Sequence, residues 1–173
     1  RTEKGILKAI APAFMNRNRS FEIIELGSGD CSKISILLKA AERNIRHIKY
    51  IPVDFSQSAI SDSATILSER YPALEIDGYV ADFIHQLNLI PHSEKDRIVC
   101  FLGSTIGNFN KTESKEIIKN LSKGILKNDT LLLGFDLVKP EEVLHAAYND
   151  SLGVTEQFNK NILNVVNGVI QSD

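Results

Sequence analysis

The segment from residue 21 to residue 41 constrains the fold of this chain more than any other stretch. Residues 21–26 are mostly apolar, which is typical of a short buried strand. Gly27-Ser28-Gly29 interrupts this run, and apolar residues recur at helical spacing from Asp30 to Ala41. The segment therefore predicts a strand, a tight turn and a helix, the unit from which parallel α/β sheets are built.

The glycine turn suits a ligand that lies against the backbone. Glycine at positions 27 and 29 permits positive φ and places no Cβ in the way. A ligand at this turn meets the positive end of the following helix. An ordinary turn between a strand and a helix also uses glycines, so the pair alone leaves both interpretations open.

The rest of the chain alternates between strand and helix patterns. Five strands alternating with helices predict a doubly wound, mostly parallel α/β sheet of Rossmann type in a single domain over residues 1–173. Its parts are a leading helix (1–16), a core (21–137) and trailing helices (140–170). The further strands are expected at residues 47–53, 74–80, 98–102 and 130–135, and the other helices at 2–15, 56–71, 111–125, 140–151 and 154–170.

Composition narrows the functional class. The net charge of −2 with 24% charged residues marks neither a nucleic-acid-binding nor a membrane-binding surface. Cys31 and Cys100 are isolated and the four histidines are scattered, so no metal site is expected. Because the chain shows no apolar run of membrane-spanning length and no charged-then-apolar leader, we expect a cytoplasmic protein.

Right-handed crossovers place the carboxyl ends of all the parallel strands on one edge of the sheet. Four polar or glycine-rich strand ends meet there, at Gly27–Gly29, Asp54, Asp82-Phe83 and Gly103–Asn108. Ligands of open α/β sheets bind at this edge. The third glycine position of the dinucleotide fingerprint holds Ser32, which argues against NAD, and no Gly-Lys-Ser/Thr phosphate loop is present.

Acidic residues before the turn (Glu25) and after the second strand (Asp54) suit a ligand with a ribose diol and a cationic centre but no phosphates. S-adenosylmethionine is such a ligand. Asp54 is predicted to accept from the ribose hydroxyls and Lys33 to pair with the methionine carboxylate. Asp82 is predicted to accept from the adenine amino group, with Phe83 packed on the ring.

Each of these assignments has a structural alternative. Asp54 could serve only to cap the next helix, and Lys33 could be a solvated surface residue. Asp82 and Phe83 could form a turn followed by a core aromatic. Their expected location at one sheet edge favours the binding interpretation over these alternatives.

Seven motifs resemble, in order and spacing, the histidine-specific S-adenosylmethionine-dependent methyltransferase family. The resemblance implies an enzyme that methylates the α-amine of histidine, as in ergothioneine biosynthesis, with cofactor contacts at Gly27, Lys33, Asp54, Asp82 and Phe83. It implies amino-acid substrate contacts at Asn108 and Tyr148, and it identifies no general base. The motifs are Glu25-Leu-Gly-Ser-Gly29 with Lys33, Pro52-Val-Asp-Phe-Ser56, Asp82-Phe83, Phe101-Leu-Gly-Ser-Thr-Ile-Gly-Asn108, Leu133-Gly-Phe-Asp-Leu-Val-Lys139, Ala147-Tyr-Asn-Asp150 and Phe158-Asn-Lys-Asn161.

The two substrate assignments also have structural alternatives. Asn108 follows Gly107 and could simply form a turn, and Tyr148 could be a half-buried core tyrosine. In the family, further substrate residues come from before Arg1 and after Asp173, and the sheet has two more strands. We therefore expect a core truncated at both ends.

An apolar stripe along residues 154–170 is expected to lack its cover and to mediate homo-oligomerisation. Two functional alternatives stay open beside the methyltransferase. One is a cofactor-binding fragment that is inactive without flanking sequence, and the other is a methyltransferase for a different small molecule. A Rossmann-type oxidoreductase is disfavoured by Ser32.

Overall fold

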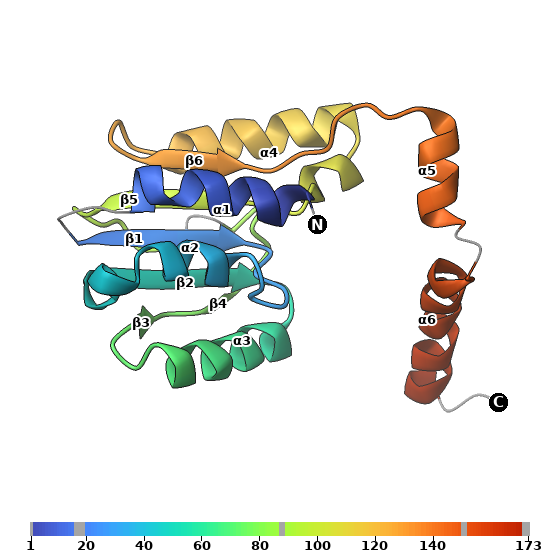
Figure 1. Ribbon diagram of the computed structural model, residues 1–173, viewed down its shortest axis with the longest axis horizontal. Coiled ribbons are helices and arrows are strands. Elements are labelled where there is room, and N and C mark those ends of the chain that lie inside the picture. The colour runs from blue at the N-terminus through green and yellow to red at the C-terminus, as the bar shows by residue number, and fades with distance from the viewer. Residues whose placement is uncertain (1, 16–19, 87–88, 150–151, 171–173) are drawn as a thin grey trace. The chain divides into compact units, whose positions relative to one another are not determined.

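The computed structural model describes residues 2–15, 20–86, 89–149 and 152–170 (Figure 1). The chain divides into two compact units, Arg1–Asp136 and Leu137–Asp173, and each is described by itself. The expected single domain over residues 1–173 stays a prediction. The first unit holds the whole sheet and most of the predicted site residues.

The sheet of the first unit is parallel throughout, with strand order β3-β2-β1-β5-β6, and β4 also pairs with β2. This confirms the predicted α/β fold. Strand β1 lies between β2 and β5, so the strand order switches at its end. The strands are β1 (Phe21–Leu26), β2 (Ile48–Asp54), β3 (Glu75–Ile76), β4 (Tyr79–Val80), β5 (Asp96–Phe101) and β6 (Thr130–Leu133).

The single strand expected at residues 74–80 is wrong in extent, because it is divided into β3 and β4. Asp77 and Gly78 separate the two short strands. The Asp77 amide still donates to the Tyr50 carbonyl at 3.0 Å. A Cβ on Gly78 would collide with the Ile60 side chain of α3 (Gln57–Arg70), so the close packing at this position suits glycine.

Helices form largely where the sequence predicts them. Ser56 caps α3 by accepting from the Ala59 amide at 3.2 Å, and Asn110 with Glu113 forms a capping box on α4. Helix α2 begins at Ile34 instead of Asp30, because the turn extends through Cys31, whose φ of 52° is left-handed. The first unit contains α1 (Thr2–Met15), α2 (Ile34–Ala40), η1 (Glu42–His47), α3 (Gln57–Arg70), η3 (Thr105–Asn108) and α4 (Lys111–Gly124).

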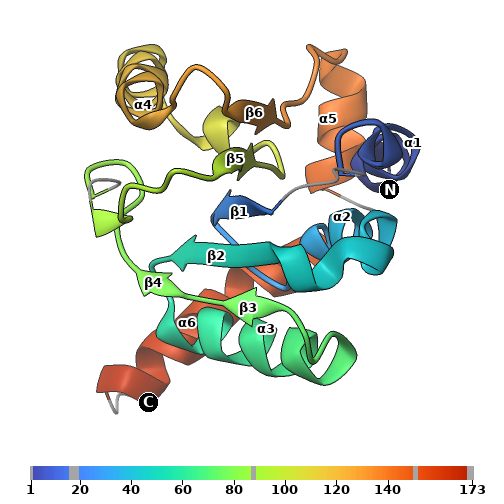
Figure 2. The ribbon, with the colours of Figure 1, turned by 90° about the vertical axis from the view of Figure 1, so that its left-hand side faces the viewer.

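Apolar residues cover both faces of the sheet. Every residue of β1 is buried, and successive side chains point to opposite faces. Figure 2 shows α1 and α2 on one side of the sheet and α4 on the other. One core joins Phe21 and Ile23 to Leu7 of α1 and Leu37 of α2, and the other joins Ile24 and Leu26 to Ile117 and Leu121 of α4.

The second unit consists of α5 (Glu141–Tyr148) and α6 (Val154–Ile170). Helix α5 ends at Tyr148, earlier than the expected residue 151. No helix among the described residues is long and apolar enough to cross a membrane. Along α6 the large apolar side chains are exposed, at Phe158, Ile162, Leu163, Val165 and Val166.

Candidate functional site

The glycine turn lies at the carboxyl end of β1, where the strand order switches. Gly27 and Gly29 have φ of 74° and 51°, and the Gly27 amide donates to the Val53 carbonyl at 2.8 Å. A Cβ on Gly29 would meet no atom within 4 Å. The turn is therefore strained for other residues and open to a ligand on its outer side.

Asp54 joins the glycine turn to the loop after β2. Its Oδ2 accepts from the Gly29 amide at 3.2 Å, and its Oδ1 accepts from the Ser56 amide at 3.0 Å. The N-cap of α3 is Ser56, so Asp54 does not cap that helix. A carboxylate has about four lone-pair sites, and two remain for a ligand beside these two bonds.

Phe83 lies in the core, as the structural alternative to adenine packing expects. Its side chain is 4% exposed, and its ring centroid lies 5.7 Å from Phe101 and 5.4 Å from Phe55. Phe55 itself is 59% exposed and directly follows Asp54. Sequence reasoning missed Phe55, although its position after the strand-ending carboxylate was a usable signal.

Asp82 organises the next loop. Its Oδ1 accepts from the Ile84 amide at 2.8 Å, and its Oδ2 lies 2.7 Å from His85 Nδ1. Burial raises the pKa of Asp82, but the hydrogen bonds from His85 and Ile84 outweigh it, so this pKa lies below its usual value. The same contact with Asp82 raises the pKa of His85.

Lys33 is held at the site by a residue that the sequence did not single out. Its Nζ lies 3.4 Å from the Glu3 carboxylate of α1, which also accepts from the Gly103 amide at 2.7 Å. A Cβ on Gly103 would collide with Lys33 Nζ. Lys33 is thus an ion-paired side chain beside the end of β5, and no local sequence pattern connects it to Glu3.

Asn108 is an exposed residue at the end of η3. The turn that leads to it is closed by the Gly107 amide, which donates to the Ser104 carbonyl at 2.8 Å. No hydrogen bond to the Asn108 side chain occurs within the described part of the chain, so turn formation does not use its amide group. Tyr148 ends α5 in the second unit and is 74% exposed, so it is not a half-buried core tyrosine.

Glu25 lies beneath the glycine turn, with 2% of its surface exposed. The Tyr50 hydroxyl donates to its Oε2 at 2.6 Å. Burial raises the pKa of Glu25 to about 7, against the lowering effects of Tyr50 and Lys33. The described residues contain no group of three or more His, Cys, Asp or Glu side chains that could hold a metal ion.

The parallel α/β fold of the first unit is shared with solved methyltransferase structures. An O-methyltransferase family protein from Burkholderia thailandensis aligns with a TM-score of 0.58 at 13% identity, covering 90% of this chain and 44% of that one. Mitomycin 7-O-methyltransferase aligns with a TM-score of 0.55 at 12% identity, covering 82% and 40%. At these identities the alignments show the fold class.

The sequence model of the histidine-specific, S-adenosylmethionine-dependent methyltransferases matches residues 1–173, so the chain belongs to this family. It is 37% identical over 173 residues to the histidine N-alpha-methyltransferase of Mycolicibacterium smegmatis, covering 100% of this chain and 54% of that protein. It is 28% identical to ergothioneine biosynthesis protein 1 of Schizosaccharomyces pombe, covering 97% and 23%. The chain spans about half the length of the first of these relatives, and the resemblance drawn from the motifs is confirmed.

Proposed function

We propose that this chain forms the cofactor-binding part of an S-adenosylmethionine-dependent N-methyltransferase that acts on the α-amine of histidine. The observation that carries the proposal is the position of Asp54. Its carboxylate lies between the open glycine turn and the exposed ring of Phe55, at the switch point of the sheet. Family membership supplies the reaction class and the amino-acid substrate.

The residues at this edge fit S-adenosylmethionine. Asp54 would accept from the ribose hydroxyls, and Asp82 would accept from the adenine amino group. Phe55, backed by Phe83, offers an aromatic face to the adenine ring. Lys33 and the open turn at Gly27 would hold the methionine carboxylate.

When bound, the cofactor supplies a methyl group on a positively charged sulfur. Methyl transfer to an amine is an in-line displacement, so the protein mainly aligns an unprotonated nitrogen and excludes water. Asn108 can accept from the substrate ammonium and donate to its carboxylate. Tyr148 would supply a further substrate contact, and we assign no general base.

A cofactor-binding fragment that needs flanking sequence for turnover is the second candidate. The chain covers 54% of the Mycolicibacterium relative, so residues outside it could complete the substrate site. No observation favours a different small-molecule substrate. We also propose that the protein is cytoplasmic.

The test is isothermal titration of the chain with S-adenosylhomocysteine, followed by histidine added to the saturated complex. We expect the first ligand to bind, and Asp54→Ala to weaken it. Asp62→Ala, an exposed carboxylate on α3, is the matched control and should bind like the parent. Histidine binding, together with methyl transfer when S-adenosylmethionine is supplied in place of S-adenosylhomocysteine, supports the complete enzyme. Cofactor binding without either supports the fragment, and binding of neither contradicts the proposal.

We also propose that α6 mediates homo-oligomerisation. Its exposed apolar side chains include Phe158 and Ile162, one helical turn apart. Sedimentation velocity should show association that Ile162→Glu abolishes and Asn161→Glu leaves intact. A monomer at all concentrations would contradict this proposal.

A further inference from the structure

Glu25 is a buried carboxyl at the proposed cofactor site that the assignments above do not use. It occupies the last part of β1, two residues before Gly27, with 2% of its surface exposed. Among the described residues, its side chain has one hydrogen-bond partner, the neutral Tyr50 hydroxyl, at 2.6 Å. No ion pair to Glu25 is found among the described residues.

Charged groups of the proposed cofactor site surround this carboxyl. Lys33, Asp30 and Asp54 all act electrostatically on Glu25. Lys33, the cation among these groups, is paired with Glu3. From the neighbouring strands, Tyr50 of β2 and Cys100 of β5 face it, and Cys31 of the turn lies close to the same Tyr50 hydroxyl. Glu25 therefore sits within electrostatic reach of a bound ligand without a cation of its own.

We propose that Glu25 lets the site distinguish the cationic methyl donor from its demethylated product. This inference rests on the proposed function. S-adenosylmethionine carries a sulfonium charge that S-adenosylhomocysteine lacks, while both carry the same ribose, adenine and amino-acid groups. An ionised Glu25 attracts the extra charge of the donor in a poorly solvated site, whereas a protonated Glu25 contributes no such preference.

The coupling between ligand binding and the protonation of Glu25 predicts how the preference for the donor depends on pH. Because burial leaves Glu25 with a pKa of about 7, the free protein holds both protonation states near neutral pH. A ligand that prefers the ionised form releases the proton, and its affinity rises with pH relative to a ligand without that preference. The ratio of the two dissociation constants therefore shifts in favour of the donor between about pH 6 and pH 8.

The experiment is isothermal titration of the parent chain with each ligand across this pH range, in two buffers of different ionisation enthalpy. We expect the donor to bind with release of up to about half a proton at pH 7, and the product to release markedly less. The preference for the donor should grow severalfold from pH 6 to pH 8. Equal proton release by the two ligands overturns the inference.

Two variants sharpen the test. Glu25→Gln should remove the pH dependence of the preference, and comparison with the parent cancels any titration of the ligands themselves. Tyr50→Phe removes a hydrogen bond that lowers the pKa of Glu25, so the preference should appear at higher pH. If Glu25→Gln fails to fold, this pH shift in Tyr50→Phe still tests the role of Glu25. Glu75→Gln, an exposed carboxylate on β3, is the control and should behave like the parent.

The outcomes separate this inference from the proposed function. If neither ligand binds at any pH, the proposed function fails. If both bind with a ratio that Glu25→Gln does not change, the function stands and the role of Glu25 is wrong. A Tyr50→Phe shift toward lower pH also contradicts it.

Discussion

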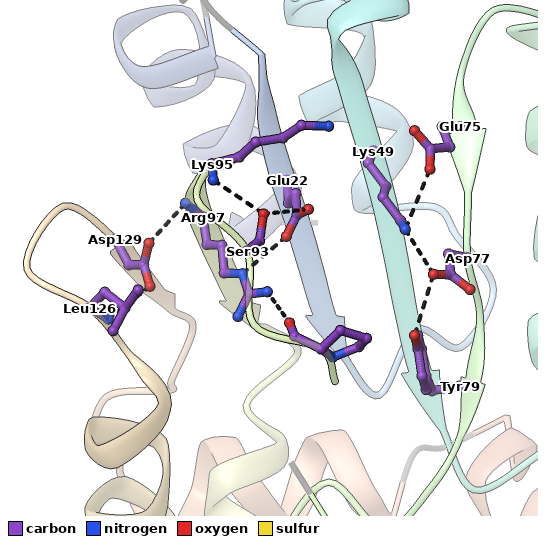
Figure 3. Close-up of polar contacts among 11 residues, drawn as sticks. Glu22, Lys49, Glu75, Asp77, Tyr79, Ser93, Lys95, Arg97, Leu126 and Asp129 are labelled. Atoms are coloured by element: carbon purple, nitrogen blue, oxygen red, sulfur yellow. Dashed lines mark hydrogen bonds and ion pairs between the residues drawn. The ribbon is translucent and has the colours of Figure 1, made fainter. Parts of the chain in front are cut away.

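The two buried glutamates of β1 lie at opposite ends of the strand and have opposite environments. Near its start, Glu22 accepts from Arg97 Nε at 3.0 Å and from the Ser93 hydroxyl at 2.9 Å. Arg97 also donates to the Pro91 carbonyl and, through its backbone amide, to Asp129 at 2.9 Å (Figure 3). Near the end of the strand, the one hydrogen-bond partner of the Glu25 side chain among the described residues is the Tyr50 hydroxyl, and burial raises the pKa of Glu25.

The two edges of the sheet therefore differ in how their buried charges are compensated. At the amino edge, charges are neutralised within the protein, as the neighbouring Lys49 also shows by pairing with Asp77 at 2.8 Å (Figure 3). At the carboxyl edge, within the part of the chain that the structure describes, Glu25 has no ion-pair partner and the Asp54 carboxylate accepts from two backbone amides. A site that is to receive a cationic ligand can keep such uncompensated carboxylates, at a cost in stability.

The largest effect is expected at the amino edge. Arg97→Met should lower the free energy of unfolding by roughly 3 to 5 kcal/mol, because it leaves Glu22 buried without its partner. Urea denaturation measures the loss. The double variant with Glu22→Leu should be more stable than Arg97→Met alone. Strict additivity of the two single losses would show that the pair is not coupled.

In the ligand-free protein, Glu25→Gln should raise the free energy of unfolding above neutral pH, whereas Arg97→Met lowers it. The folded-state pKa of Glu25 is raised from 4.5 to about 7, so the folded state binds the proton more tightly than the unfolded state. Its contribution to stability is complete below about pH 4.5 and is lost as the pH rises through 7. At pH 8 the variant should be more stable than the parent by about 3 kcal/mol, and at pH 4.5 the two should be similar. Urea denaturation at the two pH values checks this, and a parallel pH dependence of the two proteins would contradict it.

The main effect expected of Asp54→Ala is weaker binding of the cofactor. Loss of hydrogen bonds to a charged carboxylate corresponds to about 1.5 to 3 kcal/mol, or roughly a 10- to 100-fold rise in the dissociation constant for S-adenosylhomocysteine. Because Asp54 also accepts from Gly29 and Ser56, Asp54→Asn should retain part of the affinity. Isothermal titration of both variants measures the effect, and parent-like affinity in Asp54→Ala would remove the ribose assignment.

The smallest effect is expected at Lys49. This side chain is partly exposed and pairs with Asp77 and Glu75, and its pKa is raised by the hydrogen bond to Asp77. Lys49→Met should lower the free energy of unfolding by about 0.5 kcal/mol at low salt and by less at high salt. A loss as large as that in Arg97→Met would contradict the contrast between a buried and an exposed ion pair.

Local patterns were sufficient for most of the fold and for part of the site. The apolar run at 21–26, the N-cap residue Ser56 and the glycine turn each act within a few residues, and the structure forms a strand, a helix and a turn there. The division of residues 74–80 was not predictable from their alternation. Gly78, which lies between the two short strands, packs closely against Ile60 of α3, a tertiary contact that the alternation does not reveal.

By itself, the sequence determined the parallel α/β class, the glycine turn and the family, because periodicity, turn chemistry and motif order are properties of the chain alone. Only the tertiary structure decided which charges meet. It paired Lys33 with Glu3 from α1 and buried Phe83 while exposing Phe55. It also gave Glu22 an arginine partner, whereas Glu25 has no ion pair among the residues described. These outcomes depend on strand register and on helix packing, which bring together residues that no local pattern connects.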